Sequence, residues 1–210
     1  MIERAYKYKI TWRSYNFHKA EELKTSDVKW LKAEDEVILP DHYPSLILNQ
    51  EDFSRLWMML PRSARIREPE LLYNTSEHGY NLTTMYSLLR PYRNAYKFVF
   101  IIIKTGDNDV FGAFIDMVIQ HENGYQGGDD CFVFQLNRNK KWVQAEENIW
   151  FIHCGSQSIS IGTGDEGPAI FLDKTLQTGS SASSETYKNE WLTTSGRETF
   201  EVNTLEILCF

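Results

Sequence analysis

The stretch SEHGYNLTTMY, residues 76–86, places a carboxylate and an imidazole side by side at Glu77 and His78. A carboxylate that orients an imidazole can support general acid and base catalysis. Adjacent residues seldom face one another, however, and a histidine ahead of a capped helix is commonly held by local hydrogen bonds. The pair is open to two interpretations, an acid–base site or a structural corner, and the pattern favours the corner.

Cysteine chemistry is the second possibility. Cys131, Cys154 and Cys209 are scattered, without the C-x-x-C spacing of a zinc or redox motif. His153 and Cys154 are neighbours, but adjacent side chains of a strand point to opposite faces, which argues against a paired thiolate and imidazole. We therefore predict no catalytic residue, no metal site and no cofactor. A redox or hydrolytic enzyme with a Cys/His or Glu/His site is the alternative.

The segment GTGDEG, residues 162–167, matches the G-x-G-x-x-G spacing of a dinucleotide site. That motif needs a helix after its last glycine, whereas Pro168 and a strand-like segment follow here. Asp165 and Glu166 would also repel a phosphate. The segment is interpreted as a loop between strands.

A second glycine-rich stretch, GGDD at 127–130, could bind a cation through Asp129 and Asp130, but it lacks the spacing of a calcium loop. A solvated turn is the favoured interpretation, because carboxylates on glycine-rich loops are cheap to solvate and costly to bury. Such carboxylates can steer a basic protein partner. The candidate partner-binding residues are Asp129, Asp130, Asp165, Glu166 and Glu77.

The overall charge narrows the class of partner. The chain carries 22 Lys and Arg against 29 Asp and Glu, a formal net charge of −7. An acidic surface repels nucleic-acid backbones and anionic lipid headgroups. No run approaches the roughly 18 apolar residues of a membrane helix, and the first residues, MIERAYKYKI, do not resemble a signal segment. We expect a cytoplasmic protein with a protein partner, no nucleic acid and no direct membrane insertion.

Two short amphipathic helices are predicted ahead of the strands. The first has Asn49 as its N-cap, apolar residues at i, i+3, i+4 and i+7, and Pro61 as its stop. The second repeats this pattern with Asn81 as its N-cap. Gly79 permits the chain to turn sharply into that cap, and His78 supports the corner.

After Pro91 the apolar period changes from helical to extended. A hairpin is predicted from the strands KFVFIII and VFGAFIDMVI, joined by the turn TGDND. Further strand-like pieces are CFVFQL, WVQA, NIWFIH, SISIG, AIFL and EVNTLEILCF. Many short strands without intervening helices predict a mainly β fold, a two-sheet antiparallel β-sandwich with flanking helices. Residues 1–40 keep no clean period and are interpreted as an N-terminal extension or linker before a domain at 41–210.

The order of these blocks resembles the TLDc domain. The matching blocks are LLYNTSEHGYNLTTMY, VFIIIKTGDNDVFGAF, GGDDCFVFQL, SISIGTGDEGPAIFLDKTL, GSSASSETYKNEWL and LEILCF, from about Ser45 to Phe210. The resemblance implies a two-sheet β-sandwich flanked by helices. It also implies protection against oxidative damage, and several members bind the vacuolar-type proton ATPase and alter its assembly or activity.

The resemblance assigns structural rather than catalytic roles to the residues that match the family pattern. Those singled out, with the cap Asn81, are His78, Gly79, Gly112, Asp173, Gly179 and Asn189. Ser184 stands where the family usually has a loop cysteine, which argues against a cysteine-based redox role. The expected function is that of a non-enzymatic interaction module that binds the cytosolic sector of the proton ATPase. Through such a partner the chain would be recruited to endolysosomal or vesicle membranes.

Overall fold

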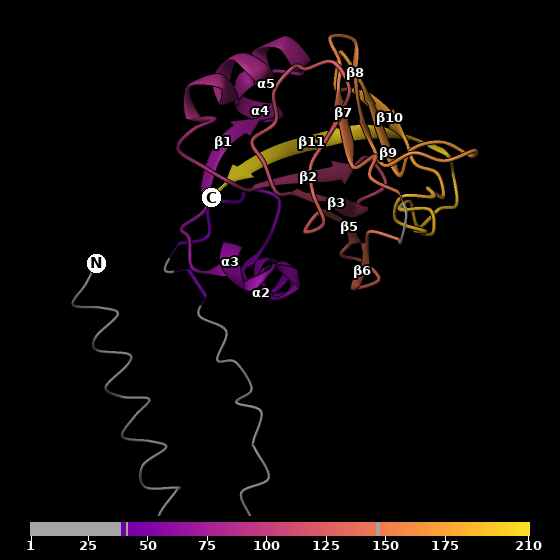
Figure 1. Ribbon diagram of the computed structural model, residues 1–210. Coiled ribbons are helices and arrows are strands. Elements are labelled where there is room, and N and C mark those ends of the chain that lie inside the picture. Colours follow the sequence, from indigo (N-terminus) through magenta and orange to yellow (C-terminus); the bar gives the residue numbers. More distant parts are fainter. Residues whose placement is uncertain (1–38, 41, 146–147) are drawn as a thin grey trace, which may run out of the picture. The chain divides into compact units, whose positions relative to one another are not determined.

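Strands dominate the computed structural model, which describes residues 39–40, 42–145 and 148–210 (Figure 1). The strands are β1 (Glu70–Asn74), β2 (Val99–Thr105), β3 (Val110–Ile115), β4 (Tyr125–Gln126), β5 (Phe132–Gln135), β6 (Lys140–Val143), β7 (Ile152–Cys154), β8 (Ser158–Ile161), β9 (Ile170–Asp173), β10 (Thr178–Ser180) and β11 (Thr199–Cys209). The helices are α2 (Gln50–Met59), α3 (Arg62–Arg65), α4 (Thr75–His78), α5 (Leu82–Leu89) and the 3₁₀ turn η1 (Arg90–Tyr92). The predicted mainly β fold with flanking helices is confirmed. The predicted extension at 1–40 lies outside the described residues, except for Leu39 and Pro40.

Hydrogen bonds join the described strands into one antiparallel sheet. The strand order is β4-β7-β8-β9-β10-β11-β2-β3-β5-β6, with β1 paired to β11 beside this path. The long strand β11 joins the part of the sheet from β4 to β10 to the part from β2 to β6, because residues 199–201 pair with β10 and residues 202–209 pair with β2. The mainly β prediction therefore holds, while a separation into two sheets is not confirmed.

Strand β2 is buried on both faces. Its odd-numbered residues from Val99 to Ile103 belong to the main apolar core, which also contains side chains of α5, β7, β8 and β9. Phe100 lies on the other face, where its ring centroid is 5.4 Å from that of Phe114 and 5.9 Å from that of Phe134. A continuous apolar run is typical of a strand covered on both sides.

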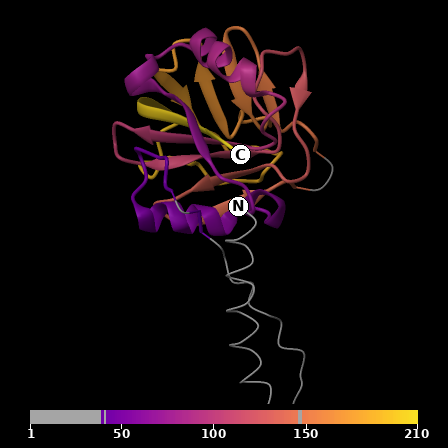
Figure 2. The same ribbon diagram turned by 90° about the vertical axis from the view of Figure 1, so that its left-hand side faces the viewer.

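Helix α2 covers the second, aromatic face. Oδ1 of Asn49 accepts a hydrogen bond from the backbone amide of Asp52 at 2.9 Å, as the predicted N-cap requires. The ring of the buried Trp57 lies 5.6 Å from that of Phe210. Figures 1 and 2 show α2 and α3 on one side of the sheet and α4 and α5 on the other. None of the helices in the described ranges is long and apolar enough to cross a membrane.

Candidate functional site

The imidazole of His78 is held by the corner that it occupies. The backbone amide of Asn74 donates a hydrogen bond to Nδ1 of His78 at 3.1 Å. The imidazole stacks on the ring of Tyr73, with centroids 5.6 Å apart. The neighbouring Glu77 is exposed. The arrangement matches a structural corner and does not support an acid–base pair.

Two caps explain the path of the chain through this corner. Oδ1 of Asn74 accepts from the amide of Ser76 at 2.7 Å and caps α4, and Oδ1 of Asn81 accepts from the amide of Thr84 at 3.0 Å and caps α5. Gly79 separates the two helices with φ of +77°, a conformation that other residues rarely adopt. Helix α4 was not predicted, because its four residues are too few for a periodic signal.

The three thiols are sealed inside the domain. Cys131, Cys154 and Cys209 are fully buried, and burial raises the pKa of each thiol to about 12. Sγ of Cys131 lies 3.2 Å from Oδ1 of Asp116 and donates to it. Nucleophilic and redox chemistry requires an accessible thiolate. The geometry therefore does not support the cysteine alternative.

Two of the glycine-rich loops leave the sheet at the same end. Strand β4 ends at Gln126, which pairs with Ile152, and β8 ends at Ile161, which pairs with the same Ile152. The segments that follow these strand ends, 127–130 and 162–169, consequently extend past the start of β7 together.

Phe151 lies between these two loops. Its carbonyl accepts a hydrogen bond from the amide of Gly162 at 2.7 Å, and a Cβ atom on Gly127 would lie 2.9 Å from its own Cβ. The loop carboxylates on either side of it are exposed. We call this group the acidic end: Asp129, Asp130, Asp165 and Glu166.

Glu77 lies apart from the acidic end. The amide of Leu82, in the same corner as Glu77, donates to the carbonyl of Lys174 at 3.0 Å. Lys174 follows β9, whereas the 162–169 loop precedes that strand. The corner and the acidic end are thus at opposite ends of β9, so the structure brings together four of the five predicted partner-binding residues. Their role in binding stays a prediction.

The G-x-G-x-x-G segment connects two strands. Gly162 follows β8, and Gly167 is succeeded by β9 rather than by a helix. The amide of Gly167 donates to the carbonyl of Gly164 at 3.1 Å, which closes a local turn. The arrangement lacks the helix N-terminus that a dinucleotide motif uses. Within the described ranges, no three His, Cys, Asp or Glu side chains come together as a metal site would require.

Gly112 and Gly179 permit close contact between strands. A Cβ atom on Gly112 would lie 1.8 Å from the carbonyl oxygen of Ile101, and one on Gly179 would lie 2.4 Å from that of Phe171. Both distances are far shorter than van der Waals contact. These glycines are required by the ladders β2–β3 and β9–β10.

Asp173 and Asn189 organise turns. Oδ1 of Asp173 accepts from the amide of Thr175 at 3.0 Å and from its hydroxyl at 2.7 Å, directly after β9. The buried Asn189 accepts from the hydroxyl of Ser184 at 2.6 Å and donates to the carbonyl of Ala182 at 2.8 Å. Both residues therefore stabilise backbone that no strand ladder supports.

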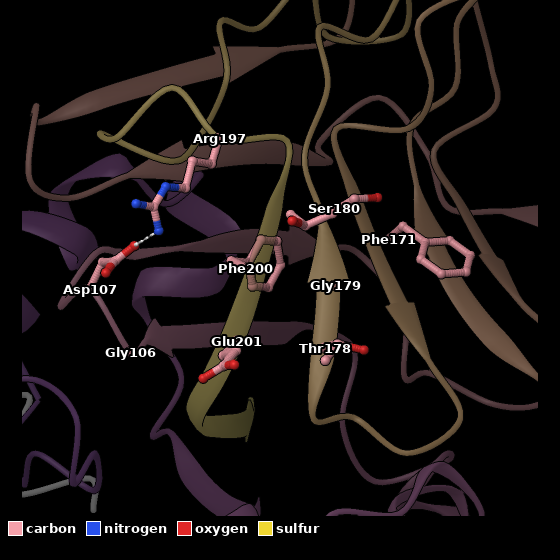
Figure 3. A pocket seen from close by; sticks show the side chains of 10 residues that line it. Gly106, Asp107, Phe171, Thr178, Gly179, Ser180, Arg197, Phe200 and Glu201 are labelled. Carbon is pink, nitrogen blue, oxygen red and sulfur yellow. Dashed lines mark ion pairs between the residues drawn. The ribbon is translucent and has the colours of Figure 1, made fainter.

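A shallow cleft of about 770 Å³ lies over β10 and the first residues of β11 (Figure 3). Figure 3 shows Arg197 directed toward Asp107, and their charged atoms are 4.0 Å apart. The hydroxyl of Thr178 donates to Asp173 at 3.2 Å. The lining residues are Gly106, Asp107, Phe171, Thr178, Gly179, Ser180, Arg197, Thr199, Phe200 and Glu201. The residues that line the cleft include no histidine or cysteine. Its charged side chains also do not pair with a lining hydroxyl in the way that a catalytic base pairs with a nucleophile.

Sequence reasoning missed a buried carboxylate, Glu206. It is fully buried and accepts hydrogen bonds from the hydroxyl of Ser45 at 2.6 Å, the amide of Leu46 at 2.8 Å and the side-chain amide of Asn74 at 2.9 Å. The signal was present, since a glutamate within the apolar run LEILCF must either face solvent or find donors.

An exposed apolar patch also escaped prediction. It comprises Tyr125, Ile149 and Trp150, whose side chains are 42%, 69% and 49% exposed. The rings of Tyr125 and Trp150 have centroids 6.2 Å apart. Large exposed apolar side chains in contact are typical of interaction sites. The signal was Trp150, directly before the buried Phe151, at a position where alternation would place a polar residue.

Comparisons with known proteins give a family and several relatives for this chain. The family model of the TLDc domain matches residues 42–210. The chain is 32% identical over 174 residues to the GTPase-activating protein skywalker of Drosophila melanogaster, covering 74% of this chain and 28% of that protein. It is 31% identical over 208 residues to human nuclear receptor coactivator 7, covering 95% of this chain and 21% of that protein. It is 30% identical over 196 residues to human oxidation resistance protein 1, covering 90% of this chain and 22% of that protein.

The chain therefore spans only between about a fifth and a little over a quarter of the length of these three relatives. The similarity covers most of this chain in each case. The region that the family model matches includes the corner, the acidic end and strand β11. The chain belongs to the TLDc domain family.

Proposed function

We propose that this chain is a non-enzymatic interaction module that acts in resistance to oxidative damage. In this proposal it binds the cytosolic sector of a vacuolar-type proton ATPase and changes the assembly or the rate of that pump. The observation that supports this proposal most directly is the acidic end, where exposed carboxylates from two loops flank Phe151. The name of the relative oxidation resistance protein 1 supports the link to oxidative stress.

The proposal excludes chemistry by the chain itself. Thiols that are buried and protonated are poor nucleophiles and poor redox sensors. The imidazole of His78 accepts from the amide of Asn74 and stacks on Tyr73. In this view no cofactor is needed, and the chain acts through surface contacts alone.

The location follows from the partner. A cytoplasmic chain that binds the cytosolic sector of the pump would be carried to endolysosomal or vesicle membranes without entering the lipid. The acidic surface supports a protein with a basic patch as the partner, because nucleic acid and anionic lipid are repelled by the same carboxylates. Electrostatic steering would then speed association and make it sensitive to salt.

The test uses the purified chain and the isolated pump. ATP hydrolysis and release of the cytosolic sector are followed with and without the chain, and complex formation is measured by gel filtration. A chain that lacks residues 1–40 is compared in parallel. The decisive variant carries Asp129→Asn, Asp130→Asn, Asp165→Asn and Glu166→Gln. We expect this variant to bind the pump more weakly, and the difference from the unchanged chain to shrink at high salt.

A matched control removes the same number of exposed carboxylates elsewhere. It carries Glu51→Gln, Glu68→Gln, Glu198→Gln and Glu201→Gln. Binding that is lost equally in both variants would show that net charge, and not the acidic end, is responsible. The proposal is abandoned if the unchanged chain forms no complex and alters neither hydrolysis nor sector release.

A further inference from the structure

The apolar patch of Tyr125, Ile149 and Trp150 is held in place by hydrogen bonds. The amide of Trp150 donates to Oδ1 of Asn148 at 2.9 Å, and the hydroxyl of Thr186 donates to the same Oδ1 at 3.0 Å. An exposed aromatic side chain on a fixed backbone loses little entropy when it is covered. The backbone that carries Trp150 is thus fixed before any partner binds.

The patch and the acidic end are adjacent. Trp150 directly precedes Phe151, the residue that touches both acidic loops. Tyr125 begins β4, and the loop with Asp129 and Asp130 follows that strand. Phe151 is buried, and its carbonyl also accepts from the hydroxyl of Tyr187 at 3.3 Å. Trp150 therefore stands one residue from the buried Phe151, which contacts both carboxylate-bearing loops, and its exposed ring neighbours that of Tyr125.

We propose that this patch and the acidic end together bind a cationic segment of a partner protein, a stretch rich in arginine or lysine. The proposal rests on the interaction role proposed above and specifies the chemistry of the partner. One guanidinium or ammonium group would lie over the ring of Trp150 or Tyr125, and its neighbours would face the carboxylates.

The negative charge of the two loops and the aromatic rings of the patch favour a cationic segment as the occupant. A cation over the face of tryptophan is attracted by the ring quadrupole, and tryptophan is the strongest receptor of this kind among the side chains. Guanidinium groups also make the strongest hydrogen bonds to carboxylates. An uncharged apolar segment would cover Ile149 and Trp150 without compensating the loop charges. Tryptophan and tyrosine are also the side chains most enriched at binding hot spots.

The probe is a synthetic octapeptide of alternating arginine and glycine, with a lysine version and a glutamate version of the same length. Binding to the full chain is measured by calorimetry and by NMR of the tryptophan indole signals. We expect the arginine and lysine peptides to bind, the glutamate peptide not to bind, and added salt to weaken the affinity. The indole signal of Trp150 should shift most.

Variants locate the site. Trp150→Ala should weaken the binding of the arginine peptide by about fivefold or more, the scale expected for a cation and ring contact, and Trp150→Phe should restore part of it. The control is Trp191→Ala, because Trp191 is also exposed, at 38%, but lies on a different loop. The melting temperature of each variant is recorded, and Tyr125→Ala provides a second test if Trp150→Ala is unstable.

Three results would overturn the inference: no binding of either cationic peptide, equal binding by the unchanged chain and Trp150→Ala, or equal binding of a neutral leucine and glycine peptide. The pump assay separates this inference from the proposed function. Peptide binding that depends on Trp150, without any effect on the pump, refutes the proposed action on the pump and supports the binding site for a cationic segment. Pump binding that is indifferent to Trp150, without peptide binding, refutes only the cationic site.

Discussion

The side-chain amide of Asn74 donates a hydrogen bond to Oε1 of Glu206 at 2.9 Å, and so links residues that lie 132 positions apart. The same carboxylate accepts from Ser45 and Leu46, which precede α2. Since Asn74 also caps α4, one buried carboxylate connects the start of the domain, the corner and the central strand. The three donors satisfy the oxygen atoms of a side chain that is shut off from water.

Removal of this carboxylate should be strongly destabilising. Glu206→Ala leaves the buried side-chain amide of Asn74 without this acceptor, at about 1 to 3 kcal/mol, and also removes the acceptor of the part-buried donors at Ser45 and Leu46. Glu206→Gln keeps one acceptor oxygen and should cost less. Urea unfolding of both variants checks the order. Equal stability of the two would contradict the importance of the acceptor atoms.

Gly112→Ala should prevent the normal pairing of β2 and β3. The added methyl group would lie 1.8 Å from the carbonyl oxygen of Ile101, so backbone would have to move. The expected loss is about 3 kcal/mol or more, above the usual cost of overpacking. The control is Gly106→Ala, where nothing lies within 4 Å. A similar melting temperature for both variants would contradict this account.

The native chain should not react with thiol reagents. With a pKa of about 12, about one thiol in ten thousand is ionised at pH 8, and each sulfur is also covered. Labelling with a disulfide reagent should give no signal in buffer and a stoichiometry of three in denaturant. Rapid labelling of any cysteine in the folded chain would reopen the cysteine alternative.

The same thiols predict an alkaline loss of stability. The ordinary pKa of 9.0 is raised to about 12 by burial, so the unfolded chain releases these protons at lower pH than the folded chain. Their stabilising contribution is complete below pH 9.0 and is lost as the pH rises to about 12. Urea midpoints across this range should fall less steeply when all three cysteines are replaced by alanine. A residual slope is expected, because burial also raises the pKa of Tyr86 and Tyr187.

His78→Ala should lower stability by about 1 kcal/mol, because one hydrogen bond to Asn74 and the stacking on Tyr73 are lost. Glu77→Ala, at an exposed neighbouring position, should change it by less than about 0.5 kcal/mol. Thermal unfolding measures both. If His78→Ala melts normally but no longer binds the pump, the histidine belongs to a functional site instead.

The elements that could be predicted are those with a complete local signal. Caps at Asn49 and Asn81 and their apolar stripes correctly predicted α2 and α5. The hairpin of β2 and β3 follows from two apolar runs around a turn. Strand β10 was missed because its residues, Thr178–Ser180, include no large apolar side chain. Strand β1 was missed because a register shift between Leu71 and Tyr73 breaks its alternation.

The surface could be predicted only in part. Glycine-rich composition indicated exposed carboxylates, and Asp129 and Asp165 are exposed. Their grouping depends on the registers of β4 and β8 against β7, which no local pattern encodes. The neighbourhood of Trp150 depends on the same registers. The partners of Glu206 come from Ser45, Leu46 and Asn74, so its role required the folded chain.

The position of β11 determines when a growing chain can fold. Its residues, 199–209, supply the partner for β1, β2 and β10, so these strands remain incomplete until translation has passed residue 209. Until then the phenylalanines on β2, β3 and β5 have no finished sheet to bury them, and exposed apolar strands of this kind bind chaperones or aggregate. During synthesis on the ribosome, the domain should therefore stay unfolded until β11 emerges. A stop codon before that strand should yield a product that is degraded rather than a smaller working domain.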